Sequence, residues 1–373
     1  MKKLDKDRLI LGFAGPALAL VVAFVLSTLV LLVSNRDPFE LYRLLFEQAS
    51  YSDVQVLIIN QAGTYYLAAL AVAVGFRMNL FNIGVDGQYR VAVFAGAAFA
   101  GQAWFPGPLN VLLTIVVAMV AGGLWASIAA YLKVRRGISE VISTIMLNAI
   151  ATGVVQWLLL KVAVKQQGSN SISTKPIPES SQLDGLGLVP GATNKVYTLI
   201  LLAVLVGALY WFVINKTRFG FDLRATGRSE SAAVASGVKV PRMVVTTMIA
   251  SGALAGLIGM PLLFGQDHSY GTTFQAGLGF AGIGIALLGR NHPLGIAAAA
   301  LLWSFLDVQS NALQIRAGVA SEVVFIIQGV ILFAVVIAYE LIRRADVRLE
   351  QQRVARELAA TRSDAPTPEG ATA

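Results

Sequence analysis

The chain has 373 residues, of which 56% are hydrophobic and 13% are charged, and its mean hydropathy is +0.68. Because soluble domains carry about 25% charged residues, this composition excludes an ordinary water-soluble fold and predicts an all-α, polytopic membrane protein. The absence of cysteine excludes disulfides and thiolate chemistry, and the net charge of +8 comes from basic residues between apolar runs rather than from a nucleic-acid surface.

Apolar runs of about 20 residues are typical of membrane spans. The sequence predicts about ten transmembrane helices, over residues 10–33, 56–76, 89–104, 109–132, 138–160, 196–214, 243–264, 276–288, 294–306 and 323–342. The third, eighth and ninth runs are short or rich in glycine. The first run leads into Ser-Asn-Arg-Asp, so we expect a retained anchor rather than a cleaved signal peptide.

Basic residues predict the orientation of these spans. Four of them precede the first run, and alternating the spans brings Arg77, residues 133–136, residues 216–242, Arg290 and the C-terminal tail to the same side. We therefore expect both termini in the cytoplasm. The transmembrane domain is expected over residues 1–345, followed by a partly disordered cytoplasmic tail over 346–373.

Uncharged amides occur within several of the apolar runs. Asn60 and Gln61 open the second run, and Asn148 and Gln156 lie eight residues apart in the fifth. Amides donate and accept hydrogen bonds without the desolvation cost of an ion, so they suit solute hydroxyls and base edges. Helix-to-helix hydrogen bonding is an equally good explanation of each residue taken singly.

The stretch FNIGVDGQ, residues 81–88, breaks the apolar pattern between the second and third runs. Asn82, Asp86 and Gln88 are costly in hydrocarbon, so the stretch lines a cavity or forms a cytoplasmic turn. A loop that dips into the membrane would satisfy both interpretations. The stretch LLGRNHPLGIAAAALLWS again places polar residues before a small-residue run, which suggests a two-fold internal pseudo-repeat.

Residues 222–242 predict a short helix on the cytoplasmic side. Ser229 is a suitable N-cap, Gly237 a suitable stop, and Pro241 prevents continuation. Such a helix has the right shape to lie in a groove of another protein. After the seventh run, Asp267 and His268 reach the opposite side, where they either meet a partner or are solvated.

Four stretches in the same order resemble the permease subunits of bacterial ATP-binding-cassette (ABC) importers for nucleosides and simple sugars, within the branched-chain amino acid and ribose-type permeases. They are FNIGVDGQ, SEVISTIMLN, LRATGRSESAAVASGV and GFAGIGIALLGRNHPLG, and the resemblance runs from about residue 55 to 340. Asp86 replaces the usual glutamate and keeps the charge. Ala281 stands where an acidic residue is common, so no carboxylate is available there.

The resemblance implies that residues 222–242 form a coupling helix on a separate ATPase, with the contacts made by Arg224, Gly227, Arg228, Ser229, Glu230, Ala232, Ala233 and Gly237. It also implies a second permease copy or a paralogous permease, an extracytoplasmic substrate-binding protein and the bacterial inner membrane. We expect no catalytic residue, metal or cofactor in this chain, because it has no phosphate-binding G-x-x-x-x-G-K-[ST] loop and ATP would be used by the partner.

The residues expected along the solute path are Asn60, Gln61, Phe81, Asn82, Asp86, Gln88, Asn148, Gln156 and Phe280. The aromatic members, with Trp157, offer stacking surfaces or simply pack. The alternative function is an ion-coupled secondary transporter, which would need intramembrane carboxylates such as Asp86, Glu140, Asp307 or Glu322. The sequence leaves open the solute and whether the pore is a homodimer or a heterodimer.

Overall fold

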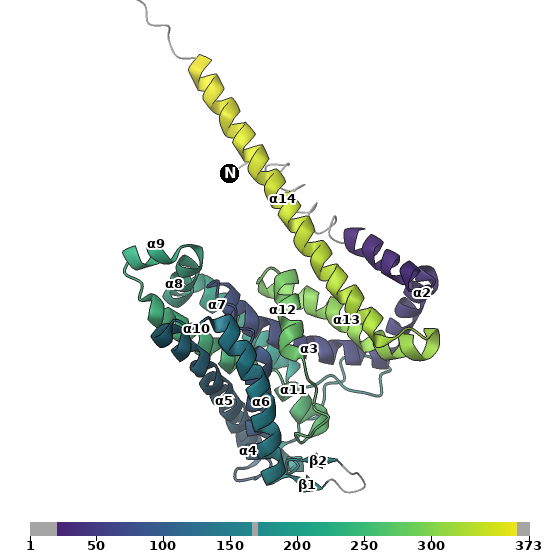
Figure 1. The fold of residues 1–373 in the computed structure, drawn as a ribbon. Helices are drawn as coiled ribbons and strands as arrows, with labels where there is room; N and C mark the ends of the chain where they lie inside the picture. The colour runs from purple at the N-terminus through teal and green to yellow at the C-terminus, as the bar shows by residue number, and fades with distance from the viewer. Residues whose placement is uncertain (1–20, 166–170, 364–373) are drawn as a thin grey trace, which may run out of the picture. The chain divides into compact units, whose positions relative to one another are not determined.

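The computed structural model describes residues 21–165 and 171–363, most of which are helical (Figure 1). This confirms the all-α fold class. The chain divides into two compact units, Leu41–Ser321 and a second unit formed by the described parts of 1–40 and 322–373. Residues 10–20 of the predicted anchor and the tail beyond residue 363 lie outside the described residues.

The second unit contains the helix Val21–Val33 and nearly all of α14 (Ser321–Ser363). α14 has 43 residues, which corresponds to about 65 Å at the rise of an α-helix. Its apolar part covers Glu322–Ala338, and the helix then continues without a break through the predicted domain boundary at 345–346. The segment expected to be a tail therefore begins as a direct extension of a helix.

Within the described residues, five helical segments are long and apolar enough to cross a membrane. They are α3 (Ser52–Phe76), α5 (Gly107–Arg136), α6 (Glu140–Val162), the run Val240–Asp267 and the first part of α13 (Pro293–Ala317). The number rises to seven if Val21–Val33 with α2 (Pro38–Ala49), and α7 (Ile200–Lys216) with α8 (Arg218–Arg228), are bent spans. The expected count of ten is not confirmed, because α4 (Val85–Ala100) and α12 (Leu278–Leu288) have only 16 and 11 residues.

α3 forms the centre of the unit Leu41–Ser321. Every residue from Leu67 to Ala73 is at most 1% exposed, and the helix packs against α7, α10 (Val240–Ala255), α12 and α13. A helix that is apolar on all sides needs neighbours on all sides. Only 33% of the apolar window of α5 and 22% of that of α6 are buried, which is typical of helices that face lipid.

α5 and α10 lie side by side (Figure 1) and touch through their backbones. A Cβ at Gly252 would collide with the carbonyl oxygen of Gly122, and a Cβ at Gly256 would collide with that of Ala118. The G-x-x-x-G spacing of Gly252 and Gly256 therefore serves close helix packing.

The two ends of this unit carry different structures (Figure 1). At one end lie the antiparallel pair β1 (Val164–Lys165) and β2 (Ile172–Ser173) and the 3-10 turn η1 (Glu179–Ser181). At the other end lie α8 and the short helix α9 (Glu230–Ala235). The run Val240–Asp267 joins the two ends through α10, α11 (Met260–Leu262) and the π-helix η2 (Leu263–Asp267).

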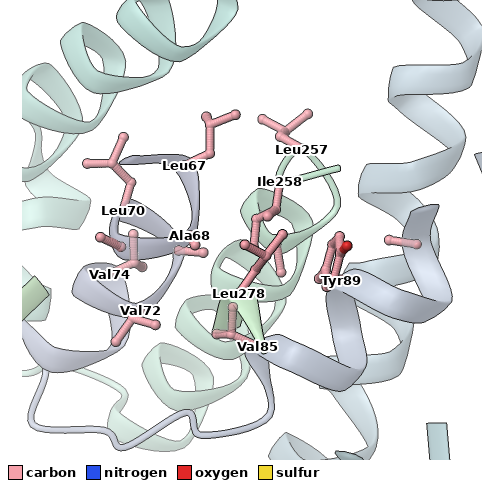
Figure 2. Packing of buried hydrophobic residues seen from close by; sticks show 14 of the residues in the cluster. Leu67, Ala68, Leu70, Val72, Val74, Val85, Tyr89, Leu257, Ile258 and Leu278 are labelled. Carbon is pink, nitrogen blue, oxygen red and sulfur yellow. The ribbon is translucent and has the colours of Figure 1, made fainter. Parts of the chain in front are cut away.

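α4 and α12 begin inside the unit rather than at either end. The backbone N–H of Gly279 donates to Asp86 Oδ1 (3.3 Å), and a Cβ on Gly279 would collide with the backbone of Asp86. Figure 2 shows Leu278 near Val85, where the two helices start, with Tyr89 one turn further along α4. Their interior starting points explain why these two helices are shorter than a membrane span.

Candidate functional site

After α3 the stretch FNIGVDGQ turns back into the unit. Asn82 is fully buried, and its Nδ2 donates to Ser251 Oγ (2.8 Å), which in turn donates to the carbonyl oxygen of Ala71 (2.6 Å). Ser251 lies about 16 Å along α10 from its first residue, counted at the helical rise per residue. The turn therefore folds back beside the last turns of α3 and reaches well along α10.

Asn82 and Gln88 form a closed pair of amides in this turn. Asn82 Nδ2 donates to Gln88 Oε1 (2.9 Å), and Gln88 Nε2 donates back to Asn82 Oδ1 (3.0 Å). Asn82 Oδ1 also accepts from the backbone N–H of Gly84 (3.1 Å). Both side chains are at most 1% exposed, so an unpaired amide here would be destabilising and the pair holds the turn in place.

Asp86 lies in the first turn of α4 and is 3% exposed. Its Oδ2 accepts from Arg90 Nε (2.9 Å), and its Oδ1 accepts from Gly279 N at the start of α12. The positive ends of two helix dipoles and one guanidinium thus face this carboxylate, which compensates for its burial.

The fifth predicted run brings Asn148 to the same turn. Asn148 Nδ2 donates to the carbonyl oxygen of Ile83 (2.9 Å), and its Oδ1 accepts from the backbone N–H of Gly87 (2.9 Å). A Cβ on Gly87 would lie 2.9 Å from Asn148 Cα, so only glycine allows this approach of α6. Gln156, two turns later on α6, is exposed instead.

The aromatic side chains expected to stack on a solute lie at the surface. Phe81, Trp157 and Phe280 are 46%, 59% and 51% exposed. Phe81 contacts Phe76, with ring centroids 5.3 Å apart. None of these three residues lines either of the two polar pockets at the β1–β2 end of the unit, and neither do the amides of the FNIGVDGQ turn.

Two adjoining polar pockets open at the β1–β2 end of the unit. The outer pocket, of about 480 Å³, includes Gln182, Asp184, Asn194, Lys195 and His268. The inner pocket, of about 350 Å³, extends along α3 and includes Gln61, Thr64, Asp267, Thr273 and Gln275. Both pockets share Leu57, Asn60, Tyr197 and Gln266. Of the predicted path residues, Asn60 and Gln61 are thus the two that line a polar pocket.

The shared residues are held by local hydrogen bonds. Asn60 Oδ1 accepts from the backbone N–H of Tyr197 (2.8 Å), and its Nδ2 donates to the carbonyl oxygen of Lys195 (3.2 Å). The Tyr197 hydroxyl donates to Gln266 Oε1 in the π-helix η2. Burial, together with the nearby Asp267 carboxylate, raises the pKa of Tyr197 to about 12, so the hydroxyl keeps the proton that it donates.

The sequence alone does not predict five of the pocket residues, which are Tyr197, Gln266, Thr64, Thr273 and Gln275. Gln266 lies in a π-helix, a local widening of the helix that often marks functional sites and that the apolar pattern of the sequence does not reveal. The polar run Gln266–Asp267–His268 at the end of a span was the available signal. Burial lowers the pKa of His268 below its usual value, so the imidazole in the outer pocket is neutral at pH 7.

Three of the four carboxylates named for the ion-coupled alternative have protein partners, and the fourth, Glu322, is exposed. Asp86 pairs with Arg90 (2.9 Å), and Glu140 Oε2 pairs with Lys133 Nζ (2.5 Å). Asp307 Oδ2 accepts from the Tyr65 hydroxyl (2.9 Å). Within the described ranges, no group of three or more Asp, Glu, His or Cys residues has a geometry that could hold a metal ion.

At the opposite end, α9 has the boundaries that its sequence predicts. Ser229 Oγ accepts from the backbone N–H of Ala232 (3.3 Å) and caps the helix, and Gly237 follows with a left-handed φ of 83°. Pro241 stands in the first turn of α10, where it starts that helix. Arg224 and Gly227 belong to α8, a helix of 11 residues that directly precedes α9.

The predicted contact residues of this segment differ in exposure. Arg228, Ser229, Glu230, Ala232 and Gly237 are exposed. Ala233 is only 2% exposed, whereas its neighbour Val234 is 57% exposed. The outward surface of α9 therefore consists of residues on either side of Ala233, which itself packs into the unit.

α8 is attached to the rest of the unit through the end of α3. A Cβ on Gly227 would collide with the backbone of Arg77 and Met78, and Arg224 Nη1 is buried and makes no hydrogen bond with the described residues. Arg77 donates from Nε (3.2 Å) and Nη2 (2.7 Å) to the carbonyl oxygen of Asn291. The turn between α12 and α13 is therefore bound to the same point as α8.

The sequence of this chain is similar to those of known proteins. Residues 55–336 match the family described as branched-chain amino acid transport system / permease component. The chain is 35% identical to the guanosine ABC transporter permease protein NupP of Bacillus subtilis, over 87% of this chain and 93% of the relative. It is 30% identical to the glucose ABC transporter permease protein TsgB13 of Haloferax volcanii, over 87% of each chain. It is 28% identical to the nucleoside ABC transporter permease protein NupB of Lactococcus lactis, over 87% of this chain and 90% of the relative.

Proposed function

Because this chain belongs to the branched-chain amino acid transport system permease family, and is therefore the multi-pass membrane permease of an ABC importer, we propose that its solute is a nucleoside or a related simple sugar. Relatives named for guanosine, other nucleosides and glucose support this class of solute. The amides and hydroxyls of the two polar pockets suit such uncharged molecules.

The observation that carries the mechanism is the exposed surface of α9. The helix is capped at both ends and presents Ala232 and Val234, an apolar patch that the described residues leave uncovered. An exposed apolar surface on a short, well-bounded helix fits a groove on another protein. We assign this partner as a separate cytoplasmic ATPase, which would use the ATP in place of this chain.

The basic residues support the same orientation. Lys133 and Arg136 at the end of α5, Arg77 at the end of α3 and Lys216 at the end of α7 share the α8–α9 end of the unit. An excess of Lys and Arg marks the cytoplasmic side of membrane proteins. The β1–β2 end, with the polar pockets, then faces outward, toward an extracytoplasmic substrate-binding protein.

The complete importer would contain two permeases, either two copies of this chain or this chain and a paralogue, in the bacterial inner membrane with both termini in the cytoplasm. The amides of the FNIGVDGQ turn would act on the path indirectly, by fixing the starts of α4 and α12. Asn60 and Gln61 are the predicted path residues with direct access to a pocket.

The test uses the permease purified with its ATPase and reconstituted in proteoliposomes with its binding protein. Val234→Glu should abolish ATP-dependent uptake and co-purification of the ATPase, because it places a charge in the apolar patch of α9. Leu188→Glu is the matched control, since Leu188 is 61% exposed at the opposite end and should leave the ATPase bound.

Ala233→Trp should act differently, through unfolding of the α9 segment, because this side chain is buried. The proposal would be wrong if Val234→Glu retained both the ATPase and uptake. Uptake by the wild-type chain without any ATPase, driven by a pH gradient, would also contradict it.

A further inference from the structure

Arg90 is a charged side chain near the middle of the membrane-spanning part of the unit. It precedes Gly96 by six residues, and a Cβ on Gly96 would lie 3.3 Å from Thr114 Cγ2 and 3.5 Å from Ala118 Cβ. Those two residues lie about 10 and 16 Å along α5 from its start at the β1–β2 end. Arg90 is about 9 Å deeper, so it lies roughly 20 to 25 Å from that end of a helix about 45 Å long.

The guanidinium of Arg90 is only partly used by the protein. Its Nε donates to Asp86 Oδ2 (2.9 Å), whereas Nη1 and Nη2 make no hydrogen bond to the described residues. The side chain of Asp86 is 4% exposed, and its other oxygen accepts from Gly279 N. The side chain of Arg90 is 24% exposed, so the carboxylate of the pair is closed off while the guanidinium keeps an accessible edge.

Such an accessible edge is not stable against lipid tails. Charged side chains within the membrane face a water-filled path or another protein. Long basic side chains near helix ends can instead extend to the headgroups, but Arg90 lies near mid-membrane and its Nε is held by Asp86. It also lies outside the two polar pockets. The accessible edge therefore points to a separate aqueous surface of the unit.

The accessible edge of Arg90 fits a particular kind of solute. Its two nitrogens donate in one plane and accept nothing, so they bind two neighbouring acceptors at once. The Arg90–Asp86 pair has no net charge, and an anion would meet the carboxylate as well as the guanidinium. Among neutral molecules, a 6-oxopurine presents O6 and N7 side by side, whereas adenine places an N6 donor beside N7.

An aromatic surface lies next to the same contact. Phe280 directly follows Gly279, whose N–H binds Asp86, and its side chain is 51% exposed. Nucleobases stack on aromatic side chains irrespective of their sequence. The starts of α4 and α12 thus supply both a donor edge and a stacking face for a base.

We propose that Arg90 binds the solute near mid-membrane through Nη1 and Nη2, and that it selects 6-oxopurine nucleosides by their O6 and N7 acceptors. Asp86 is the positioning residue, because it fixes the plane of the guanidinium through Nε. This inference rests on the proposed function, from which it takes the nucleoside class. It adds a solute contact outside the polar pockets and a role for the carboxylate of the FNIGVDGQ turn.

The first test measures the selectivity of uptake. The wild-type chain and Arg90→Lys are reconstituted with the ATPase and the binding protein, and ATP-dependent uptake of guanosine, inosine and adenosine is measured. Arg90→Lys keeps the charge beside Asp86 but lacks the planar pair of donors. We expect the ratio of guanosine to adenosine uptake to fall at least about fivefold, with the Tm and the amount of bound ATPase nearly unchanged.

Because the binding protein is the same in both samples, a change in this ratio arises in the permease. A ratio that stays the same, including an equal loss of uptake for all three nucleosides, would overturn the proposal.

The second test keeps Arg90 intact and omits the binding protein. The sequence has no cysteine, so Phe280→Cys gives a single thiol beside the Asp86–Gly279 contact. Leu124→Cys is the matched control, because Leu124 is 65% exposed and lies about 25 Å along α5, at a depth similar to that of Arg90. Each variant is purified with its ATPase and alkylated with a small water-soluble maleimide.

We expect Phe280→Cys to react several-fold faster than Leu124→Cys, since only the former faces water. Saturating guanosine or inosine should slow the reaction of Phe280→Cys several-fold, and adenosine should slow it much less. Equal reaction of the two thiols, or equal protection by the three nucleosides, would refute the site.

Uptake by the wild-type complex separates this inference from the proposed function. If the wild-type complex imports guanosine with ATP and Arg90→Lys keeps the uptake ratio, Arg90 is not the selecting contact while the importer function stands. If the wild-type complex shows no ATP-dependent uptake of any of the three nucleosides or of glucose, the proposed function itself fails.

Discussion

The amide pair of Asn82 and Gln88 predicts a definite outcome in a double-mutant cycle. Asn82→Leu removes four hydrogen bonds, two to Gln88, one to Ser251 and one to Gly84. At about 1 kcal/mol net for each bond, the substitution should lower the free energy of unfolding by about 4 kcal/mol, and by more where buried partners are left unpaired.

Gln88→Leu removes the same two reciprocal bonds from the other side. When both amides are replaced, those two bonds are lost only once, and apolar side chains of similar size face each other. The double variant should therefore be more stable than the sum of the single effects predicts, by about 2 kcal/mol.

The free energy of unfolding is measured by denaturant titration of the purified chain in detergent. Asn215→Leu is the control, because Asn215 is exposed and makes a single bond to the carbonyl oxygen of Trp211 (2.9 Å). Strict additivity of the two single substitutions would refute the closed amide pair. Uptake is then compared per amount of folded protein, which separates loss of the fold from loss of the path.

Three further predictions concern packing, attachment and pH. Gly252→Val should lower the Tm because its side chain would meet the α5 backbone, whereas Gly153→Val should be tolerated because a Cβ there meets nothing within 4 Å; equal Tm values would contradict this packing. Arg77→Gln should lower the free energy of unfolding by about 2 kcal/mol, because it removes the charged hydrogen bonds to Asn291. Arg218→Gln, at a side chain that is 95% exposed, should change the free energy of unfolding little. A larger loss of stability in Arg218→Gln than in Arg77→Gln would be inconsistent with the attachment of α8. Burial lowers the pKa of His268 in the folded chain, so the unfolded chain takes up this proton first as the pH falls. Stability is therefore lost as the pH falls below about 6.5. The fall in Tm between pH 7.5 and 5.5 should be smaller in His268→Gln, and an identical fall would exclude this cause.

Local signals predicted α9 well. The N-cap at Ser229 and the left-handed stop at Gly237 depend on a few neighbouring residues, so they can be recognised in the sequence. Which residue of α9 points outward depends on contacts with the rest of the unit. That is why Ala233 was grouped with the contact residues although it is buried, and why exposed Val234 was not.

Composition also predicted the fold class but not the number of spans. α4 and α12 are apolar runs like the others, and only their contacts show that they begin in the interior. In the same way, the sequence showed that Asn82 is costly in hydrocarbon. It could not show that the partner is Ser251, 169 residues further along the chain.

The run Val240–Asp267 connects the two ends of the unit Leu41–Ser321. Its 28 residues correspond to about 42 Å, from a point just after α9 to the π-helix that carries Gln266. The close contact of Gly252 with Gly122 packs the middle of this segment against α5. If an ATPase binds α9 as proposed, a force applied there would reach Gln266 along this one helical run, within a single chain.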